Sequence, residues 1–130
     1  MDTAITATAT LRSWDETPTP DADAPVPRLA TAEVAFAYEG DLTGTSTCHY
    51  VLRYGPDGSG DAVGYETITG TCEGEDATLT VAHSCRFDGG GVVDDIVAVD
   101  GTGPMAEVRG AGSFQVGHGG TGWSWSVGRA

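Results

Sequence analysis

The sequence of 130 residues contains no lysine, and its six arginines are scattered along the chain, so the formal net charge is −13. Nucleic acids and anionic membrane surfaces are bound through clusters of basic side chains, which this sequence lacks. We therefore expect neither a nucleic acid nor a membrane among its partners. The acidic residues are dispersed too, which is typical of a solvated surface that keeps a protein soluble.

Long apolar runs and targeting signals are also missing. The sequence has no stretch of about 18 apolar residues, so no transmembrane helix is predicted. Its N-terminus lacks the positively charged start and apolar block of a secretion signal. We expect a cytoplasmic protein.

Cysteine is scarce, and the spacing of the cysteines does not match that of a metal site. The three cysteines, Cys48, Cys72 and Cys85, are odd in number and form no CxxC pair. This pattern argues against both a disulfide framework and a zinc site. We expect three free thiols. A nucleophilic Cys48 or Cys85 is an alternative to the usual role of buried cysteine as a small apolar side chain.

Motifs that hold cofactors and metals are absent as well. The sequence has no glycine-rich phosphate loop before a helix, no serine nucleophile elbow, no HExxH and no dinucleotide fingerprint. It therefore predicts no metal and no cofactor. General acid–base chemistry and control of substrate shape remain open.

What is present is a strand-forming composition. Segments rich in Thr, Val, Ile and Tyr alternate in polarity, and 20 glycines punctuate them, while helical periodicity never exceeds a turn or two. One domain covering residues 1–130 is expected. We predict an all-β fold in which about eight antiparallel strands close into an up-and-down barrel, because closure removes exposed edges. The expected strands are 3–14, 28–39, 46–54, 62–72, 77–87, 92–99, 112–116 and 122–127.

Residues 15–27 hold four of the six prolines and three of the aspartates. Proline lacks the N–H that a sheet requires, so we expect this segment to be a loop that pairs with no strand. The preceding Trp14, followed by Asp15 and Glu16, either rims one mouth of the barrel or ends the first strand.

The hairpin around residues 73–76 carries the most informative pair. With Gly74 and Glu75 as a two-residue loop, Glu66 lies opposite His83 on an otherwise apolar face. Opposed residues have Cβ atoms about 5 Å apart, so the carboxylate and imidazole are expected to share a hydrogen bond in the core. Such a pair is either a satisfied structural contact or a proton-handling site.

The inward face of the central strands mixes apolar walls with a few polar groups, the composition of a ligand pocket. An eight-stranded barrel is filled by its side chains or holds one small ligand. We therefore predict these substrate-contacting residues: Cys48, Leu52, Ile68, Val81, Cys85, Asp94, Ile96, Trp123 and Trp125.

Five ordered motifs carry a family resemblance: SWDE (13–16), GDLTG (40–44), YGPDGSGDAVGYETITG (54–70), VAHSCRFDGG (81–90) and DGTGPMAEVRGAGSF (100–114). They resemble the bacterial DUF3224 family, which is similar to allene oxide cyclase-like and dirigent-like barrels. The chain departs from that pattern at Asp94–Ile96 and at Cys48–Tyr50. Those two segments suggest either a specialised pocket or neutral drift.

The resemblance implies a cofactor-independent cyclase or isomerase that acts on a hydrophobic intermediate of secondary metabolism. Its expected catalytic residues are Glu66 and His83 as the proton-handling pair and Tyr50 as a hydrogen-bond donor. Two alternatives stay open. One is a non-catalytic barrel that binds a small molecule, and the other is a structural homodimer or homotrimer with a packed interior.

Overall fold

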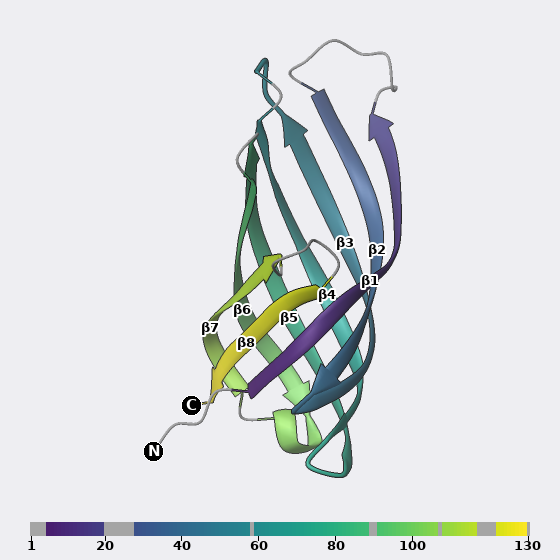
Figure 1. Cartoon of the computed structure of the whole chain (residues 1–130), viewed down its shortest axis with the longest axis vertical. Coiled ribbons are helices and arrows are strands. Elements are labelled where there is room, and N and C mark those ends of the chain that lie inside the picture. Colours follow the sequence, from purple (N-terminus) through teal and green to yellow (C-terminus); the bar gives the residue numbers. More distant parts are fainter. Residues whose placement is uncertain are drawn as a thin grey trace.

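Eight antiparallel strands, each hydrogen-bonded to the next and the last to the first, form a closed barrel (Figure 1). The computed structural model describes residues 5–19, 28–57, 59–88, 91–106, 108–116 and 122–129. The predicted all-β, up-and-down barrel is confirmed. Its strands are β1 (Ile5–Thr19), β2 (Arg28–Gly40), β3 (Leu42–Tyr54), β4 (Gly60–Cys72), β5 (Glu75–Asp88), β6 (Gly91–Thr102), β7 (Val108–Val116) and β8 (Gly122–Arg129).

The alternation of polarity along each strand decides which side chains enter the barrel. In β4, Glu66 and Ile68 are buried, whereas Thr67 and Thr69 between and after them are exposed. Successive side chains of a strand point to opposite faces, so threonine covers the outside while larger apolar residues fill the inside. The predicted inward parity of the central strands is therefore confirmed.

The turn between β4 and β5 differs from the prediction. It consists of Glu73 and Gly74, both with positive φ (55° and 79°), and Cys72 pairs with Glu75. Two positive φ values are characteristic of the type I′ turn, which suits the twist of a hairpin. The predicted register is thus wrong by two positions: Glu66 lies opposite Val81, and His83 lies opposite Gly64. An even shift preserves parity, so both side chains still point inward.

The expected loop at 15–27 begins later than predicted. β1 continues to Thr19, and Pro18 pairs with Ala30 of β2. The physical reason is that β8 pairs with β1 only between Ile5 and Thr10. Beyond Thr10, β1 is paired on one side only among the described residues, and proline is tolerated on an edge. Residues 20–27 lie outside the described part of the chain.

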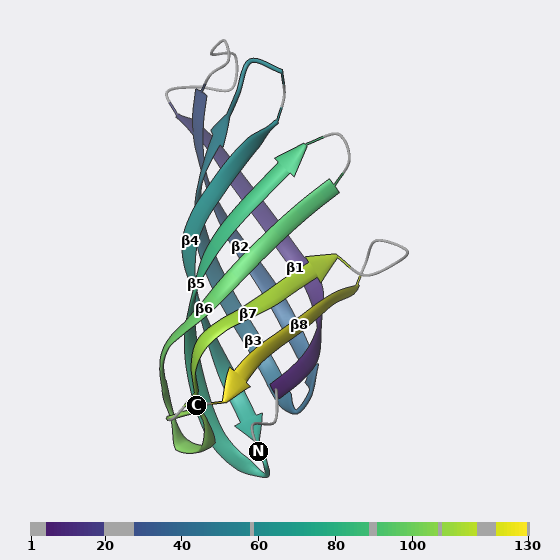
Figure 2. The ribbon, with the colours of Figure 1, turned by 90° about the vertical axis from the view of Figure 1, so that its left-hand side faces the viewer.

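The two ends of the barrel differ. At the lower end in Figure 1, the 3₁₀ turn η1 (Gly103–Met105) places Met105 inside the barrel, fully buried with Leu42. At the opposite end, β1 to β4 extend beyond the shorter β7 and β8, as Figure 2 also shows. We call this end, where β1, β3 and β5 finish, the mouth.

All three cysteines are buried and free, as predicted. The described residues include no helix that is both long and apolar enough to cross a membrane.

Candidate functional site

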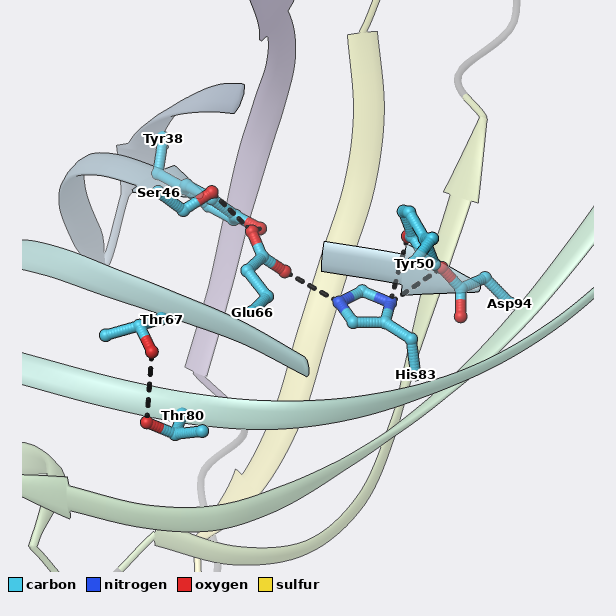
Figure 3. Close-up of polar contacts among 8 residues, drawn as sticks. All are labelled: Tyr38, Ser46, Tyr50, Glu66, Thr67, Thr80, His83 and Asp94. Carbon is cyan, nitrogen blue, oxygen red and sulfur yellow. Dashed lines mark hydrogen bonds and ion pairs between the residues drawn. The ribbon is translucent and has the colours of Figure 1, made fainter. Parts of the chain in front are cut away.

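A chain of polar side chains crosses the inside of the barrel (Figure 3). At its centre, His83 Nε2 lies 2.7 Å from Glu66 Oε1, and neither side chain is exposed to solvent. The contact runs diagonally between neighbouring strands, and the residue directly opposite His83 is Gly64, which has no side chain. The predicted contact between Glu66 and His83 is therefore present, although its predicted register is wrong.

Glu66 is saturated by further donors. The Tyr38 hydroxyl donates to Glu66 Oε2 at 2.5 Å, and the Ser46 hydroxyl donates to the same oxygen at 2.5 Å. With His83 on the other oxygen, both carboxylate oxygens are hydrogen-bonded inside the core. Buried carboxylates require such partners, because desolvation of an unpaired charge costs several kcal/mol.

The second carboxylate lies on the other side of the imidazole. His83 Nδ1 is 2.8 Å from Asp94 Oδ2, and the Tyr50 hydroxyl lies 3.4 Å from the same oxygen and 3.3 Å from His83 Nδ1. Asp94 Oδ1 accepts no hydrogen bond from any described residue, and Figure 3 shows it directed away from the dashed contacts. We call the whole set the polar cluster: Tyr38, Ser46, Tyr50, Glu66, His83 and Asp94.

The two carboxylates decide the charge of the imidazole. Burial by itself lowers the pKa of His83, but hydrogen bonds with Asp94, Cys48 and Glu66 raise that pKa to about 12. His83 is therefore an imidazolium at neutral pH, with both ring nitrogens donating, one to each carboxylate. The arrangement holds a proton firmly between two acids.

The neighbouring tyrosine hydroxyl and cysteine thiols are held in their protonated forms. Burial and the charge of nearby groups raise the pKa of the Tyr50 hydroxyl above its ordinary value. Burial and the charge of Asp94 raise the pKa of the Cys85 thiol to about 12, and burial also raises the pKa of Cys48. Thiols in this state are poor nucleophiles, which supports the packing role of both cysteines over a nucleophilic one.

Nearly all the predicted interior residues point into the barrel. The structure buries Tyr50, Glu66 and His83, so the three predicted catalytic residues are brought together. The backbone of Trp123 belongs to β8, but its side chain is not among those that the structure describes. The other predicted contact residues are all buried: Cys48, Leu52, Ile68, Val81, Cys85, Asp94, Ile96 and Trp125.

Aromatic side chains connect the polar cluster with the mouth. The ring of Trp14 stacks on that of Tyr50 with centroids 6.0 Å apart, yet Trp14 is 44% exposed. Tyr54 and Phe87 pack edge to face beside it along the strands and are partly exposed, and the Tyr54 hydroxyl donates to Glu16. Of the two interpretations of Trp14, the structure supports the one in which it rims the mouth. We call Trp14, Tyr54 and Phe87 the mouth aromatics.

Sequence reasoning missed Tyr38 and Ser46. Both follow from parity: Tyr38 continues the buried series Val34 and Phe36 in β2, and Ser46 lies two residues before buried Cys48 in β3. A hydroxyl on an otherwise apolar stripe needs a partner, and that requirement was the available signal.

The sequence and the structure were compared with known proteins. The family model for DUF3224, described as a protein of unknown function, matches residues 5–125. The chain belongs to the DUF3224 family. Among solved structures, a DUF3224 protein of unknown function from Shewanella oneidensis MR-1 shares the fold with a TM-score of 0.74 and 16% identity, over 98% of this chain and 96% of that one. No curated protein matches the chain.

The DUF3224 assignment confirms the first part of the predicted resemblance. The similarity of the DUF3224 barrel to allene oxide cyclases stays a prediction. Across the part of the chain that the structure describes, no group of three or more His, Cys, Asp or Glu side chains is placed to hold a metal ion.

Proposed function

We propose that this DUF3224 barrel admits a small, largely apolar molecule through its mouth and converts it, without a cofactor, into an isomer or a cyclised product. The observation that carries the proposal is the position of Tyr50. Its hydroxyl contacts the charged pair His83–Asp94, while its ring stacks on the exposed Trp14. One side chain thus links the buried charges to the accessible end of the barrel.

The geometry favours a division of roles that differs from the one predicted from sequence. Glu66 has all its contacts within the core, so we assign it to positioning His83 rather than to substrate contact. The imidazolium of His83 fixes the charge beside Tyr50. The Tyr50 hydroxyl then turns its one proton from Asp94 Oδ2, 3.4 Å away, to an oxygen of the substrate that gains negative charge during the reaction, and apolar walls hold the substrate in one reactive conformation.

The predicted similarity to allene oxide cyclase-like barrels, which direct reactive intermediates without cofactors, points to the same reaction class. The free, buried cysteines support the cytoplasm as the location, where thiols stay reduced. A homodimer or homotrimer is supported by outward-facing apolar side chains on β3, β4 and β6, where Val51, Val63, Tyr65 and Val97 are each about half exposed or more.

A second candidate is a binding barrel without catalysis. The observation that favours it is the position of His83, with its two ring nitrogens 2.7 and 2.8 Å from the carboxyl oxygens of Glu66 and Asp94, because an imidazole bound on both sides exchanges its protons slowly. In that case the polar cluster fixes the shape of the barrel and orients a ligand, and no bond is made or broken.

The test exploits the fact that isomerisation and cyclisation conserve mass. Wild-type protein is incubated with a fractionated small-molecule extract of the host, and liquid chromatography with mass spectrometry follows peaks that change retention time at constant mass. We expect one such conversion, slowed about 10²- to 10³-fold by Tyr50→Phe, the typical cost of removing one hydrogen-bond donor to a developing negative charge.

A matched variant tests the location of the site. Ala62 lies on the inward face between Leu52 and Cys85, one step below the mouth aromatics Tyr54 and Phe87. Ala62→Phe should block entry while Tyr50 stays intact, and circular dichroism verifies the fold. If the protein retains a small molecule from the extract but converts none, the result supports the binding barrel. If it neither retains nor converts any molecule, the result contradicts both candidates.

A further inference from the structure

We propose that the ligand of this barrel carries a cationic ammonium group, which binds the free oxygen of Asp94 while its apolar part lies among the mouth aromatics. This inference rests on the proposed function, since it names the substrate class of the same site. It follows from three observations on the polar cluster, the mouth and the charge of the whole chain.

The first observation is an unused acceptor. Asp94 is 1% exposed, and its Oδ2 receives His83 and Tyr50, whereas its Oδ1 has no donor among the described residues. A buried carboxylate oxygen without a donor costs about 1–3 kcal/mol or more, because the group has lost its water. A donor supplied by a ligand removes that cost.

The second observation is the balance of charge. Two acidic side chains, Glu66 and Asp94, flank the single basic side chain His83, so acids outnumber bases in the cluster. A buried acidic group is stabilised by a positive charge at close range. Within the cluster, Asp94 has the free oxygen and Glu66 has none, so the counter-charge belongs beside Asp94.

The third observation is the lining of the approach. Phe87 lies two residues beyond Cys85, which pairs with Asp94, so Phe87 and Asp94 are diagonal neighbours in the register of β5 and β6. Trp14 and Tyr54 complete the rim with their faces partly open to solvent. These rings offer apolar surface to the hydrocarbon part of the ligand, and a chain of net charge −13 concentrates cations around it.

Three probes of equal chain length test the inference: n-octylammonium, n-octanol and octanoate. Each is titrated into wild-type protein at pH 7 by isothermal calorimetry. An alkylammonium stays charged at this pH, as a lysine side chain does. We expect octylammonium to bind about 10- to 100-fold more tightly than octanol, the range of one charge-assisted hydrogen bond, and octanoate to bind most weakly.

Two variants of adjacent residues locate the effect. Asp94→Asn removes the charge inside the barrel, and Asp95→Asn removes the same charge from the exposed face of the same strand. The advantage of octylammonium over octanol should disappear in Asp94→Asn and persist in Asp95→Asn. If circular dichroism shows that Asp94→Asn is unfolded, the order of affinities of the three probes for wild-type protein decides whether the inference holds.

The outcomes separate the two proposals. Octanol binding as tightly as octylammonium, or octanoate binding best, overturns the cationic ligand and leaves the binding barrel in place. Equal loss of octylammonium binding in Asp94→Asn and Asp95→Asn also overturns it, because the attraction is then that of the surface charge. Failure of all three probes to bind overturns the proposed function as well.

Discussion

Replacement of His83 by glutamine should be among the most destabilising single changes in the barrel interior. Glutamine has a similar size but carries no charge, so Glu66 and Asp94 lose the cation between them. The two contacts of 2.7 and 2.8 Å join side chains with no solvent exposure. Imidazolium donates from opposite sides of its ring to both carboxylates at once, whereas the single amide group of glutamine can reach only one of them.

The magnitude follows from two independent estimates. Each hydrogen bond to a charged group is worth about 1.5–3 kcal/mol, and His83 makes two. Removal of one partner from a buried ion pair costs about 3–5 kcal/mol. We therefore expect His83→Gln to lower the free energy of unfolding by about 3–5 kcal/mol, a large share of the roughly 5–15 kcal/mol of a typical domain.

The assay is urea unfolding at pH 7 followed by circular dichroism, with the midpoint and slope fitted separately. The matched control is Asp61→Asn, which breaks a contact of similar length, 2.8 Å to Arg53, between side chains about half exposed. An exposed pair contributes little to stability, so this control should unfold almost as wild type does. Equal unfolding midpoints for His83→Gln and Asp61→Asn would refute the buried-charge interpretation.

Three further predictions follow from the same interior. Because the pKa of His83 is raised from 6.5 to about 12 on folding, its stabilisation is complete below pH 6.5 and is lost as the pH rises toward 12; unfolding curves between pH 7 and 10 should show a decline that His83→Gln lacks. Gly64→Ala should destabilise by about 1–3 kcal/mol, since a Cβ there would lie 2.0 Å from the His49 carbonyl oxygen; a melting temperature equal to wild type would contradict this. The three thiols should react with a thiol reagent only slowly in native protein and completely after unfolding, and rapid native labelling of Cys85 would show that it is accessible.

Much of the fold was predictable because the side chains of a β-strand alternate between its two faces, and this alternation is visible in the sequence. Alternation of polarity in β3, β4 and β5 identified the inward residues, and an even error in register left that parity intact. The turn was misplaced by one residue because Glu73 adopts a positive φ, which the sequence pattern assigns more readily to Gly74 alone. Pro18 was misassigned because edge pairing depends on where β8 ends, which is a tertiary property.

The site was predictable in part. Glu66, His83 and Tyr50 share the inward face, and parity alone brings them near one another. Their order in the polar cluster depends on how the diagonal contact passes Gly64, and no local pattern contains that information. The raised pKa of His83 depends on contacts with Asp94 and Glu66 together, which come from two different strands, so the sequence pattern alone did not predict it.

A crystal structure of the protein with n-octylammonium bound tests the central claim most directly, namely that the polar cluster is the floor of a ligand site open at the mouth. The account predicts the ammonium nitrogen within about 3 Å of Asp94 Oδ1, the length of a charge-assisted hydrogen bond, and the alkyl chain among Trp14, Tyr54 and Phe87. A probe bound only on the outer face of the strands, with the interior of the barrel unchanged, would contradict the account.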